Sequence, residues 1–471
     1  MSSPPAPSSM ASLRAELLAE FELVADHTAF ATVDELHARM RDLTDRHPDV
    51  ASIARVGTSR LGEKLWCLTI GAADAEVSTP AALVFAMPHP NEPIGALTAL
   101  QLAQRLCEDA RLRRSTGLVW HIVACIDPDG TRLNEGWFAG PFTRTHYGRN
   151  FYRPAGPEQV EWNFPFAYKD AFVDRVMPET LALMRLIDDT RPLLMCSLHN
   201  SELGGAYYYV SWDEPELFAQ LQAIPQHLGI PLETGEPEAS WSVPYADGIY
   251  PVLRREDTYD HAERLGLDPA ADPSGATSTS YADRHGTYTL VCELPYWADD
   301  RSAVGDQPLG TSYAAALRRQ AADMRELIGV LSNTLETVED DLSVESPFIR
   351  ATRFFAAFLP GIPADAEQRA AEAASERSAT AAEQRSLRDV VHSCRVRYAG
   401  MLLRALEGEL AIGNHAPAIR AAVASLAPRH ADWCELAEAA TAERPIPIRD
   451  LVASQLGAIL ATAWHLTAAR P

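Results

Sequence analysis

Apolar and polar positions along the first three hundred residues alternate between two periods. Short apolar runs of strand character occur at residues 65–70, 81–87, 118–126, 193–198 and 288–294. Between them, apolar positions recur at helical spacing, most clearly at 94–106 and 177–188. Strands that alternate with helices predict an α/β domain with a mostly parallel sheet.

The pattern changes after about residue 340, where windows rich in Ala, Glu, Arg and Leu replace the strands. Apolar residues there recur at helical spacing, as in Val390, Cys394, Tyr398 and Met401, and residues 450–465 repeat the pattern. We therefore expect three parts: a leader with the start of the first helix at 1–25, an α/β domain at 26–340, and an all-α C-terminal domain at 346–471.

Two long stretches without a clear period, 127–166 and 231–285, interrupt the α/β part. Loops of that length inside a domain are usually functional.

Composition and charge narrow the range of partners and locations. Of 471 residues, 47% are apolar and 22% charged, which is typical of a globular protein. The net charge of −23 disfavours nucleic acid and an anionic membrane surface as partners. Seven cysteines lack paired spacing, and the N-terminal residues lack the basic-then-apolar order of a secretory signal. We therefore expect a reducing, cytoplasmic location.

A polar pair at the end of one apolar run carries the first chemical signal. The run 82–87 leads into the sequence PHPNE, which contains His89 and Glu92, and a helix is predicted just after it. Ligands generally bind at the carboxyl ends of strands in open α/β sheets, and imidazole and carboxylate are both normal zinc ligands. Alone, His-x-x-Glu is a weak signal, since the chain repeats it at His199 and Glu202.

Two further polar residues lie at or within apolar strands much later in the chain. His199 ends the run 193–198, and in a parallel sheet this strand end can converge with that of His89. Two histidines and one glutamate would leave zinc an open position for water, as catalytic zinc requires. Glu293 interrupts the run 288–294, where a carboxylate is costly unless it is paired, hydrogen-bonded or protonated. We interpret Glu293 as a general base of raised pKa, with a structural ion pair as the alternative.

Taken in order, these segments resemble the carboxypeptidase A-like zinc carboxypeptidase family. Residues 57–62, GTSRLG, look like the family's glycine-serine-glycine turn, and DPDG at 127–130 is similar to its Asn-Pro-Asp-Gly loop. HPNE at 89–92, SLH at 197–199 and CEL at 292–294 match the segments that bear its zinc ligands and its catalytic glutamate. The resemblance spans roughly residues 30–300. It implies a mixed, mostly parallel sheet with helices on both faces, one zinc ion per chain held by His89, Glu92 and His199, and catalysis by Glu293.

The resemblance fails where the family binds a C-terminal carboxylate. Members that trim a C-terminal residue hold that group with an Asn-Arg pair, but Glu161 and Trp162 stand at the matching positions before Asn163. Tryptophan cannot make the planar two-pronged hydrogen bond of arginine, and an acid at Glu161 would repel a carboxylate or pair with an amine.

Other residues of the two long stretches are candidates for binding the substrate. Arg149 and Arg153 follow the DPDG segment and are candidates for a replacement carboxylate clamp. The family also stabilises the oxyanion with an arginine of this loop, which implies Arg144 here. For its mobile tyrosine, Tyr281 is the candidate closest in sequence to Glu293.

The leading hypothesis is a zinc-dependent hydrolase that cleaves an amide bond in a peptide or peptide-like small molecule. One alternative is a zinc deacylase of N-acyl amino acids of the aspartoacylase kind, and another is a metal-free binding protein on the same fold. Neither nucleic acid nor a membrane is expected as a partner. We expect the C-terminal helices to cap the active site or to form a homo-oligomer contact.

Overall fold

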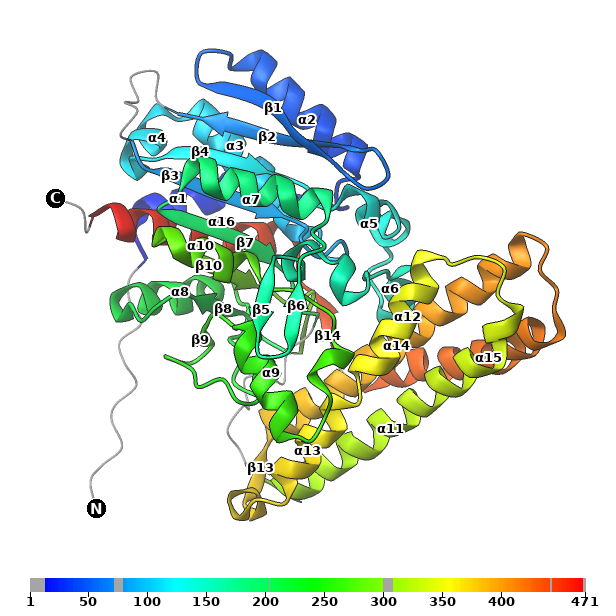
Figure 1. The fold of residues 1–471 in the computed structure, drawn as a ribbon. Coiled ribbons are helices and arrows are strands. Elements are labelled where there is room, and N and C mark those ends of the chain that lie inside the picture. The colour runs from blue at the N-terminus through cyan, green and yellow to red at the C-terminus, as the bar shows by residue number, and fades with distance from the viewer. Residues whose placement is uncertain (1–12, 72–78, 203, 300–307, 441–442, 469–471) are drawn as a thin grey trace, which may run out of the picture.

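The structure, a computed structural model, describes residues 13–71, 79–202, 204–299, 308–440 and 443–468 (Figure 1). Residues 1–12 of the predicted leader lie outside this range. The first helix, α1 (Ala15–Glu22), begins within the residues that were assigned to the leader and the start of a helix.

An eight-stranded sheet forms the centre of the larger part of the molecule (Figure 1). Its spatial order is β1 (Ala51–Thr58), β2 (Lys64–Ile70), β4 (Val119–Val123), β3 (Ala81–Ala86), β7 (Leu194–His199), β10 (Tyr288–Glu293), β8 (Tyr207–Val210) and β9 (Ile249–Pro251). The pairs β4–β3, β3–β7, β7–β10 and β8–β9 are parallel, while β1–β2, β2–β4 and β10–β8 are antiparallel. The predicted mixed, mostly parallel sheet is confirmed.

The central strands β3, β7 and β10 are buried along their whole length. Strands covered on both faces are near-continuous apolar runs, which is why their positions are readable from the sequence. Along β3, Leu83 and Phe85 face one core, and Ala82, Val84 and Ala86 face another.

Helices cover both faces of the sheet. On one face lies α7 (Pro178–Thr190), which contacts β1 and β3 and packs against α10 (Ser278–Ala282). The other face is covered by α3 (Ile94–Glu108) and α16 (Ile448–Ala468), around which pack α1, α2 (Val33–Arg46), α4 (Ala110–Thr116) and α8 (Pro215–His227).

The helix α16 is long and apolar enough to cross a membrane, judged by length and composition. In the structure, 78% of its most apolar window is buried inside the protein. It contacts α3, α8, β7 and β10, so these contacts account for its apolar character as that of a core helix.

The helices α11 to α15 form an arm beside the sheet (Figure 1). We call residues 308–440 the helical unit. It contains β12 (Pro308–Ser312), α11 (Tyr313–Val338), α12 (Pro347–Phe358), α13 (Gly361–Ala370), β13 (Ser378–Thr380), α14 (Ala381–Ala411) and α15 (Pro417–Ala439).

The chain leaves for the helical unit and returns from it at one place. Strand β11 (Trp297–Asp299) precedes the unit, β14 (Glu443–Pro445) follows it, and the two pair in antiparallel fashion. The packing therefore divides the chain differently from the predicted boundaries at 340 and 346: α11 belongs with the arm, and α16 returns to the sheet.

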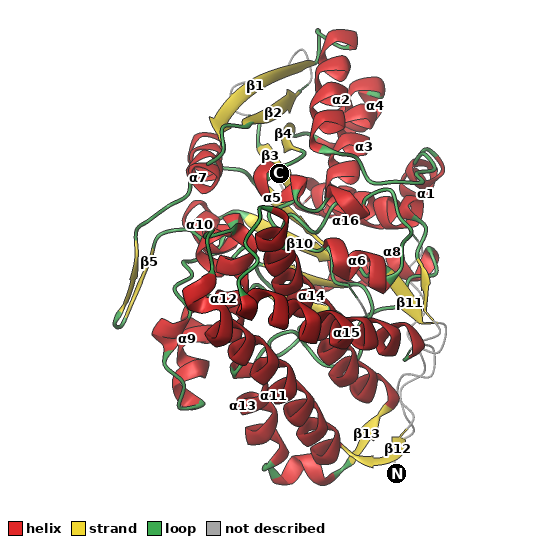
Figure 2. Ribbon diagram, turned by 90° about the vertical axis from the view of Figure 1, so that its right-hand side faces the viewer, coloured by secondary structure: helices red, strands yellow, loops and turns green. Residues whose placement is uncertain are grey.

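The two long stretches contain short elements, and both contact the helical unit, which faces the viewer in Figure 2. The first holds α5 (Pro128–Arg132) and α6 (Arg144–Asn150) and leads into the hairpin of β5 (Phe166–Tyr168) and β6 (Ala171–Val173). The second holds β9, α9 (Arg255–Arg264) and α10. Short 3₁₀ turns complete the described chain at Glu135–Trp137, Gly156–Glu158, Val160–Trp162, Pro269–Ala271, Asp283–His285, Glu339–Asp341 and Ala373–Glu376.

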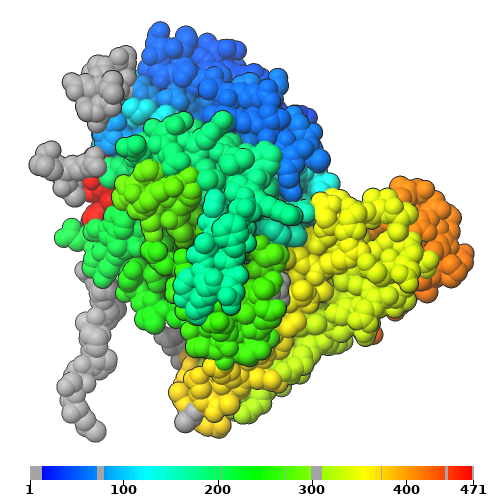
Figure 3. All heavy atoms as spheres, in the orientation of Figure 1, coloured from blue at the N-terminus to red at the C-terminus, as the bar shows by residue number. Residues whose placement is uncertain are grey.

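The helical unit packs directly onto these stretches, as the space-filling view shows (Figure 3). Helix α6 of the first stretch contacts both α14 and α15. In the second stretch, Ser240 donates a hydrogen bond to Asp365 of α13 at 2.8 Å, and Glu236 accepts one from Tyr313 of α11 at 2.7 Å.

Candidate metal centre

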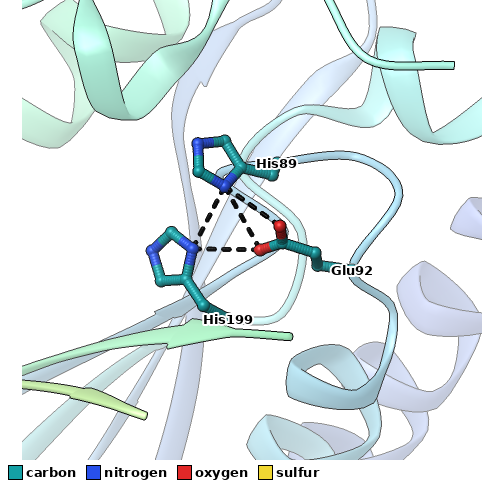
Figure 4. Close-up of side chains that lie close together, drawn as sticks. All are labelled: His89, Glu92 and His199. Atoms are coloured by element: carbon teal, nitrogen blue, oxygen red, sulfur yellow. Dashed lines mark hydrogen bonds and ion pairs between the residues drawn. The ribbon is translucent and has the colours of Figure 1, made fainter. Parts of the chain in front are cut away.

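Three polar side chains converge at the carboxyl edge of the sheet (Figure 4). His89 and Glu92 lie in the turn after β3, and His199 is the last residue of β7. The two strands are parallel neighbours, with Ala86 opposite Leu198, so both ends reach the same edge. The predicted convergence of His89, Glu92 and His199 is present in the structure.

Gly95 lets the turn after β3 sit close to the end of β7. A Cβ atom at this position would lie 2.6 Å from the Cβ of Leu198, which no side chain tolerates without displacing the strand. Glycine here allows α3 to begin directly behind the ligands.

The donor atoms fit one zinc ion. The Nδ1 atoms of His89 and His199 are 3.1 Å apart, and they lie 3.1 Å from Oε1 and 2.9 Å from Oε2 of Glu92, respectively. Ligands about 2.1 Å from a tetrahedral zinc lie about 3.4 Å from one another, so small shifts would accommodate the metal. Two imidazoles and one carboxylate also match the donor set of catalytic zinc sites.

Burial and mutual charge dominate the electrostatics of this cluster. Burial and the neighbouring Arg153 guanidinium lower the pKa of His89 to about 3. Burial also acts to lower the pKa of His199, but its hydrogen bond to Glu92 and the charges of three carboxylates raise that pKa to about 9. A cation placed among these groups would balance their excess negative charge.

Glu293 is the last residue of β10 and lies beside the ligands. Its backbone is in register with that of His199 on the parallel strand β7. One carboxylate oxygen, Oε1, lies 3.8 Å from Nδ1 of His199, and the residue is 8% exposed. Burial raises the pKa of Glu293 well above its usual range, as a general base working near neutral pH requires.

Comparison with known proteins finds a family that the ligand-bearing segment resembles. The model of the zinc carboxypeptidase family matches residues 36–224, which include all three ligands. This part of the chain is similar to the zinc carboxypeptidase family. The segment that bears Glu293 lies beyond the matched residues.

Individual relatives are distant. Carboxypeptidase SOL1 from Arabidopsis thaliana is 26% identical over 193 residues, which are 40% of this chain and 36% of that protein, so the chain spans about a third of its length. The structure of carboxypeptidase A from Helicoverpa armigera is 15% identical, with a TM-score of 0.40 and coverage of 77% of this chain and 80% of that one. The structure of murein-tripeptide amidase MpaA from Escherichia coli O157 is 20% identical, with a TM-score of 0.29 and coverage of 52% and 83%.

Glu161 contacts the strand that carries His199. Its carboxylate is buried and accepts hydrogen bonds from the backbone and hydroxyl of Ser278, at 3.1 and 2.6 Å. It also accepts one from Ser197 at 3.4 Å, and Ser197 Oγ lies 2.8 Å from Nε2 of His199. Glu161 is therefore linked to a zinc ligand through one hydroxyl, and such links orient ligating histidines.

Trp162 packs on the metal centre. Its ring meets that of His89 edge-on, with centroids 5.4 Å apart. The guanidinium of Arg153 lies over the same indole, 5.6 Å from its centroid. Trp162 thus forms one wall of the site and packs against Arg153.

Arg153 contacts two of the ligands. Its Nη1 is 2.9 Å from Oε1 of Glu92, and its Nη2 is 2.7 Å from Nδ1 of His89. Gln159 holds the same side chain by accepting a hydrogen bond from its Nε at 3.1 Å. Of the three loop arginines named from the sequence, Arg153 is the one placed at the ligands.

The other sequence candidates lie elsewhere. Arg144 is buried and donates to the carbonyl of Ala437 in α15 at 3.4 Å. Arg149 is exposed on α6, and its charge acts on residues of α15. The hydroxyl of Tyr281 donates to Asp188 of α7 at 2.8 Å, and its ring packs on Phe164. The structure brings none of these three into the ligand contacts it gives.

Sequence reasoning did not find a buried hydrogen-bonded chain behind the metal centre. Arg397 of α14 pairs with Glu202 at 2.9 Å, Glu202 accepts from Tyr147 at 2.6 Å, and Tyr147 accepts from Asn91 at 3.3 Å. Asn91 lies between His89 and Glu92, so the chain supports the ligand turn. The second His-x-x-Glu match of the sequence is explained here, since Glu202 joins this network and not the ligand cluster.

Sequence reasoning also missed Gln455 of α16. This side chain connects the end of β7, which carries His199, with the end of β10, which carries Glu293. Its Nε2 donates to the carbonyl of His199 at 2.8 Å and lies 3.4 Å from that of Cys292. Its Oε1 accepts from Thr98 of α3 at 2.9 Å. The sequence signal that could have identified Gln455 is the presence of a polar residue within the apolar run of α16.

Proposed function

We propose that this protein is a zinc-dependent hydrolase that cleaves an amide bond in a peptide or peptide-like small molecule. The observation that carries the proposal is the convergence of His89, Glu92 and His199 with Glu293, whose Oε1 lies 3.8 Å from Nδ1 of His199. Zinc bound to these ligands would supply a Lewis acid for the scissile carbonyl.

The role of Glu293 in this proposal is to move a proton. Its raised pKa suits a carboxylate that takes a proton from the attacking water and then delivers it to the leaving amine. Its place at the end of β10, opposite His199, holds it within reach of a carbonyl presented at the ligands.

Arg153 takes the role for which the sequence suggested Arg144. Its guanidinium lies at the ligand cluster, where it can donate to the carbonyl oxygen of the substrate and stabilise the negative charge that develops there. Trp162 and Gln159 support this side chain from two directions.

The surroundings of Glu161 and Trp162 bear on the class of substrate. Glu161 faces the hydroxyls of Ser278 and Ser197, and Trp162 packs on His89, so neither side chain offers a clamp for a carboxylate. We propose a substrate without a free carboxylate at this position. The match to the zinc carboxypeptidase family supports a peptidase-like amide hydrolase over the aspartoacylase-like deacylase.

The test combines metal analysis with matched substrates. Purified protein should bind one zinc per chain, and it should hydrolyse N-benzoylglycyl amino-acid amides faster than the same compounds with a free C-terminal carboxylate. Protein that takes up no stoichiometric zinc would support the binding-protein alternative. Faster cleavage of the free acids would overturn the proposed substrate class and leave the proposed hydrolase in place.

We further propose that the protein works in the cytoplasm. The seven cysteines are all buried as free thiols, which supports a reducing compartment. A homo-oligomer through the C-terminal helices stays a prediction.

A further inference from the structure

One face of α14 lies against the loop that carries Arg153. Arg397, Met401 and Arg404 are spaced i, i+4 and i+7 along this helix, so they share one side of it. The helix approaches α6 so closely that a Cβ atom on Gly400 would lie 2.4 Å from the carbonyl oxygen of Gly148. We call Arg397, Met401 and Arg404 the loop face of α14.

The guanidinium of Arg404 contacts the ends of two short helices at once. Its Nη1 donates to the carbonyls of Asn150 and Phe151, at 2.7 and 2.9 Å, where α6 ends. Its Nη2 donates to the carbonyl of Leu133 at 3.2 Å, where α5 ends. Helix C-termini present free carbonyls and a partial negative charge, so a cation is well placed at both.

Further hydrogen bonds fix the backbone of Tyr152 and Arg153, which follow Phe151. The backbone N–H of Tyr152 donates to Oδ1 of Asn134 at 3.0 Å, and its carbonyl accepts from Nδ2 of the same side chain at 2.9 Å. The backbone N–H of Arg153 points to Sδ of Met401 at 3.5 Å. The backbone from Asn150 to Arg153 is therefore fixed from both sides before the Arg153 side chain begins.

Arg404 occupies an unusual place for a charged group. Burial lowers the pKa of Arg404 to about 10, and its guanidinium lies over the ring of Phe348 with 4.3 Å to the centroid. A charge withdrawn from water is costly unless its hydrogen bonds are satisfied, and the half-buried guanidinium of Arg404 donates to three backbone carbonyls. An apolar side chain would fill the space at lower cost but would leave those carbonyls without a donor.

We propose that Arg404 is a positioning residue that holds Arg153 beside the metal ligands through the backbone of residues 150–153. The proposal rests on the proposed function, in which Arg153 stabilises the substrate's carbonyl oxygen. It gives the helical unit a part in the reaction, although the contacts of Arg404 are all made away from the ligands.

The test compares Arg404→Met with a control from the same helix. Arg395 also lies on α14, where it is buried, but it pairs with Asp323 and Glu326 of α11, inside the helical unit. Arg395→Met therefore perturbs the unit and leaves the loop contacts in place. With the best benzoylglycyl substrate, Arg404→Met should lower kcat by about 10- to 100-fold with a smaller change in KM, whereas Arg395→Met should change kcat by no more than about twofold.

A double-mutant cycle separates positioning from general damage. If Arg404 acts through Arg153, then Arg404→Met should lower kcat by no more than about twofold when Arg153→Met is already present. Equal losses of kcat in both backgrounds would overturn the proposal. Arg404→Lys keeps the positive charge and can still donate toward one of the two helix ends, so its kcat should lie between those of Arg404→Met and the wild type. If Arg404→Met does not fold, Arg404→Lys serves as the test variant.

Hydrogen–deuterium exchange of the full chain tests the same contact without substrate. Arg404→Met should raise amide exchange in peptides that cover residues 133–153, and Arg395→Met should raise it in α11 instead. Unchanged exchange at 133–153 in Arg404→Met would overturn the proposal. If the wild-type protein cleaves no substrate of the panel, the proposed function fails, and exchange still decides whether Arg404 holds the loop.

Discussion

The two nitrogens of the His199 imidazole contact different partners. Nδ1 faces the other ligands, while Nε2 lies 2.8 Å from the hydroxyl of Ser197, which in turn reaches Glu161. Because the hydroxyl fixes the ring orientation, the geometry of the metal centre depends on a side chain that is not itself a ligand.

Ser197→Ala should weaken zinc binding by about 10- to 100-fold, since it frees the ring of His199 to rotate. The affinity can be measured by competition with a fluorescent chelator. Ser201→Ala is a matched control, because the described residues offer no hydrogen-bond partner to the buried Ser201 hydroxyl. Equal affinities for Ser197→Ala and the wild type would contradict the role of this hydroxyl.

Glu293→Gln should keep one zinc per chain and lower kcat by about 10²- to 10⁴-fold, because the amide cannot take a proton from water. Zinc content is checked by atomic absorption, and turnover with the benzoylglycyl amides. A variant that retains wild-type turnover would remove Glu293 from the mechanism.

The sequence carried more information on the ligands than on the arginine beside them. His89, Glu92 and His199 each follow an apolar strand, so the sheet dictates where they meet. Arg144 and Arg153 belong to a long loop, and the direction of their side chains is set by packing against α14, α15 and Trp162. Nothing in the local pattern encodes those contacts.

At the scale of elements, the strands of the sheet's centre were predictable and its edges were not. The runs 193–198 and 288–294 became β7 (Leu194–His199) and β10 (Tyr288–Glu293) almost unchanged. The edge strands β1 and β9 are partly exposed and lack a continuous apolar run, which is the signal of a strand covered on both faces.

Gln455→Leu should lower both the melting temperature and the zinc affinity. The substitution leaves the carbonyls of His199 and Cys292 buried without this donor, and each unmet group costs about 1–3 kcal/mol. Thermal unfolding and chelator competition measure the two effects.

Thr462→Val provides the control for Gln455, since the hydroxyl of Thr462 only donates to Ala458 within α16. It should lower the melting temperature slightly and leave zinc affinity unchanged. Equal losses of zinc affinity in Gln455→Leu and Thr462→Val would show that α16 supports the sheet as a whole and not the strand ends in particular.

For the whole molecule, composition indicated a helical C-terminal region at 346–471, whereas packing groups the helices of residues 308–440 together. The helical unit lies between two strands that pair with each other, β11 and β14, so its two ends are defined by a tertiary contact. Helix α11 (Tyr313–Val338) has the same apolar period as a helix that covers a sheet, so its sequence does not indicate which part of the molecule it joins. Its packing against α13 and α14 assigns it to the arm.

Removal of the metal should affect the whole molecule. Chelation should abolish turnover, and one equivalent of zinc should restore it. Because a ligand that binds only the folded state stabilises it, zinc at 100 times its Kd should raise the free energy of unfolding by about 2.7 kcal/mol. Calorimetry with and without zinc measures the shift, and identical melting curves would argue against a metal at His89, Glu92 and His199.

The place of α16 in the chain has a consequence for synthesis. A nascent chain that has emerged as far as Glu293 contains the three ligand residues and Glu293 itself, but the helix that supplies Gln455 and packs against β7 and β10 is still to come. Since domains generally fold as units during translation, the metal centre matures only after the ribosome has also made the helical unit and α16. The edge of the sheet that carries the ligands is therefore among the last parts of the molecule to be completed, although its first ligand, His89, is made early.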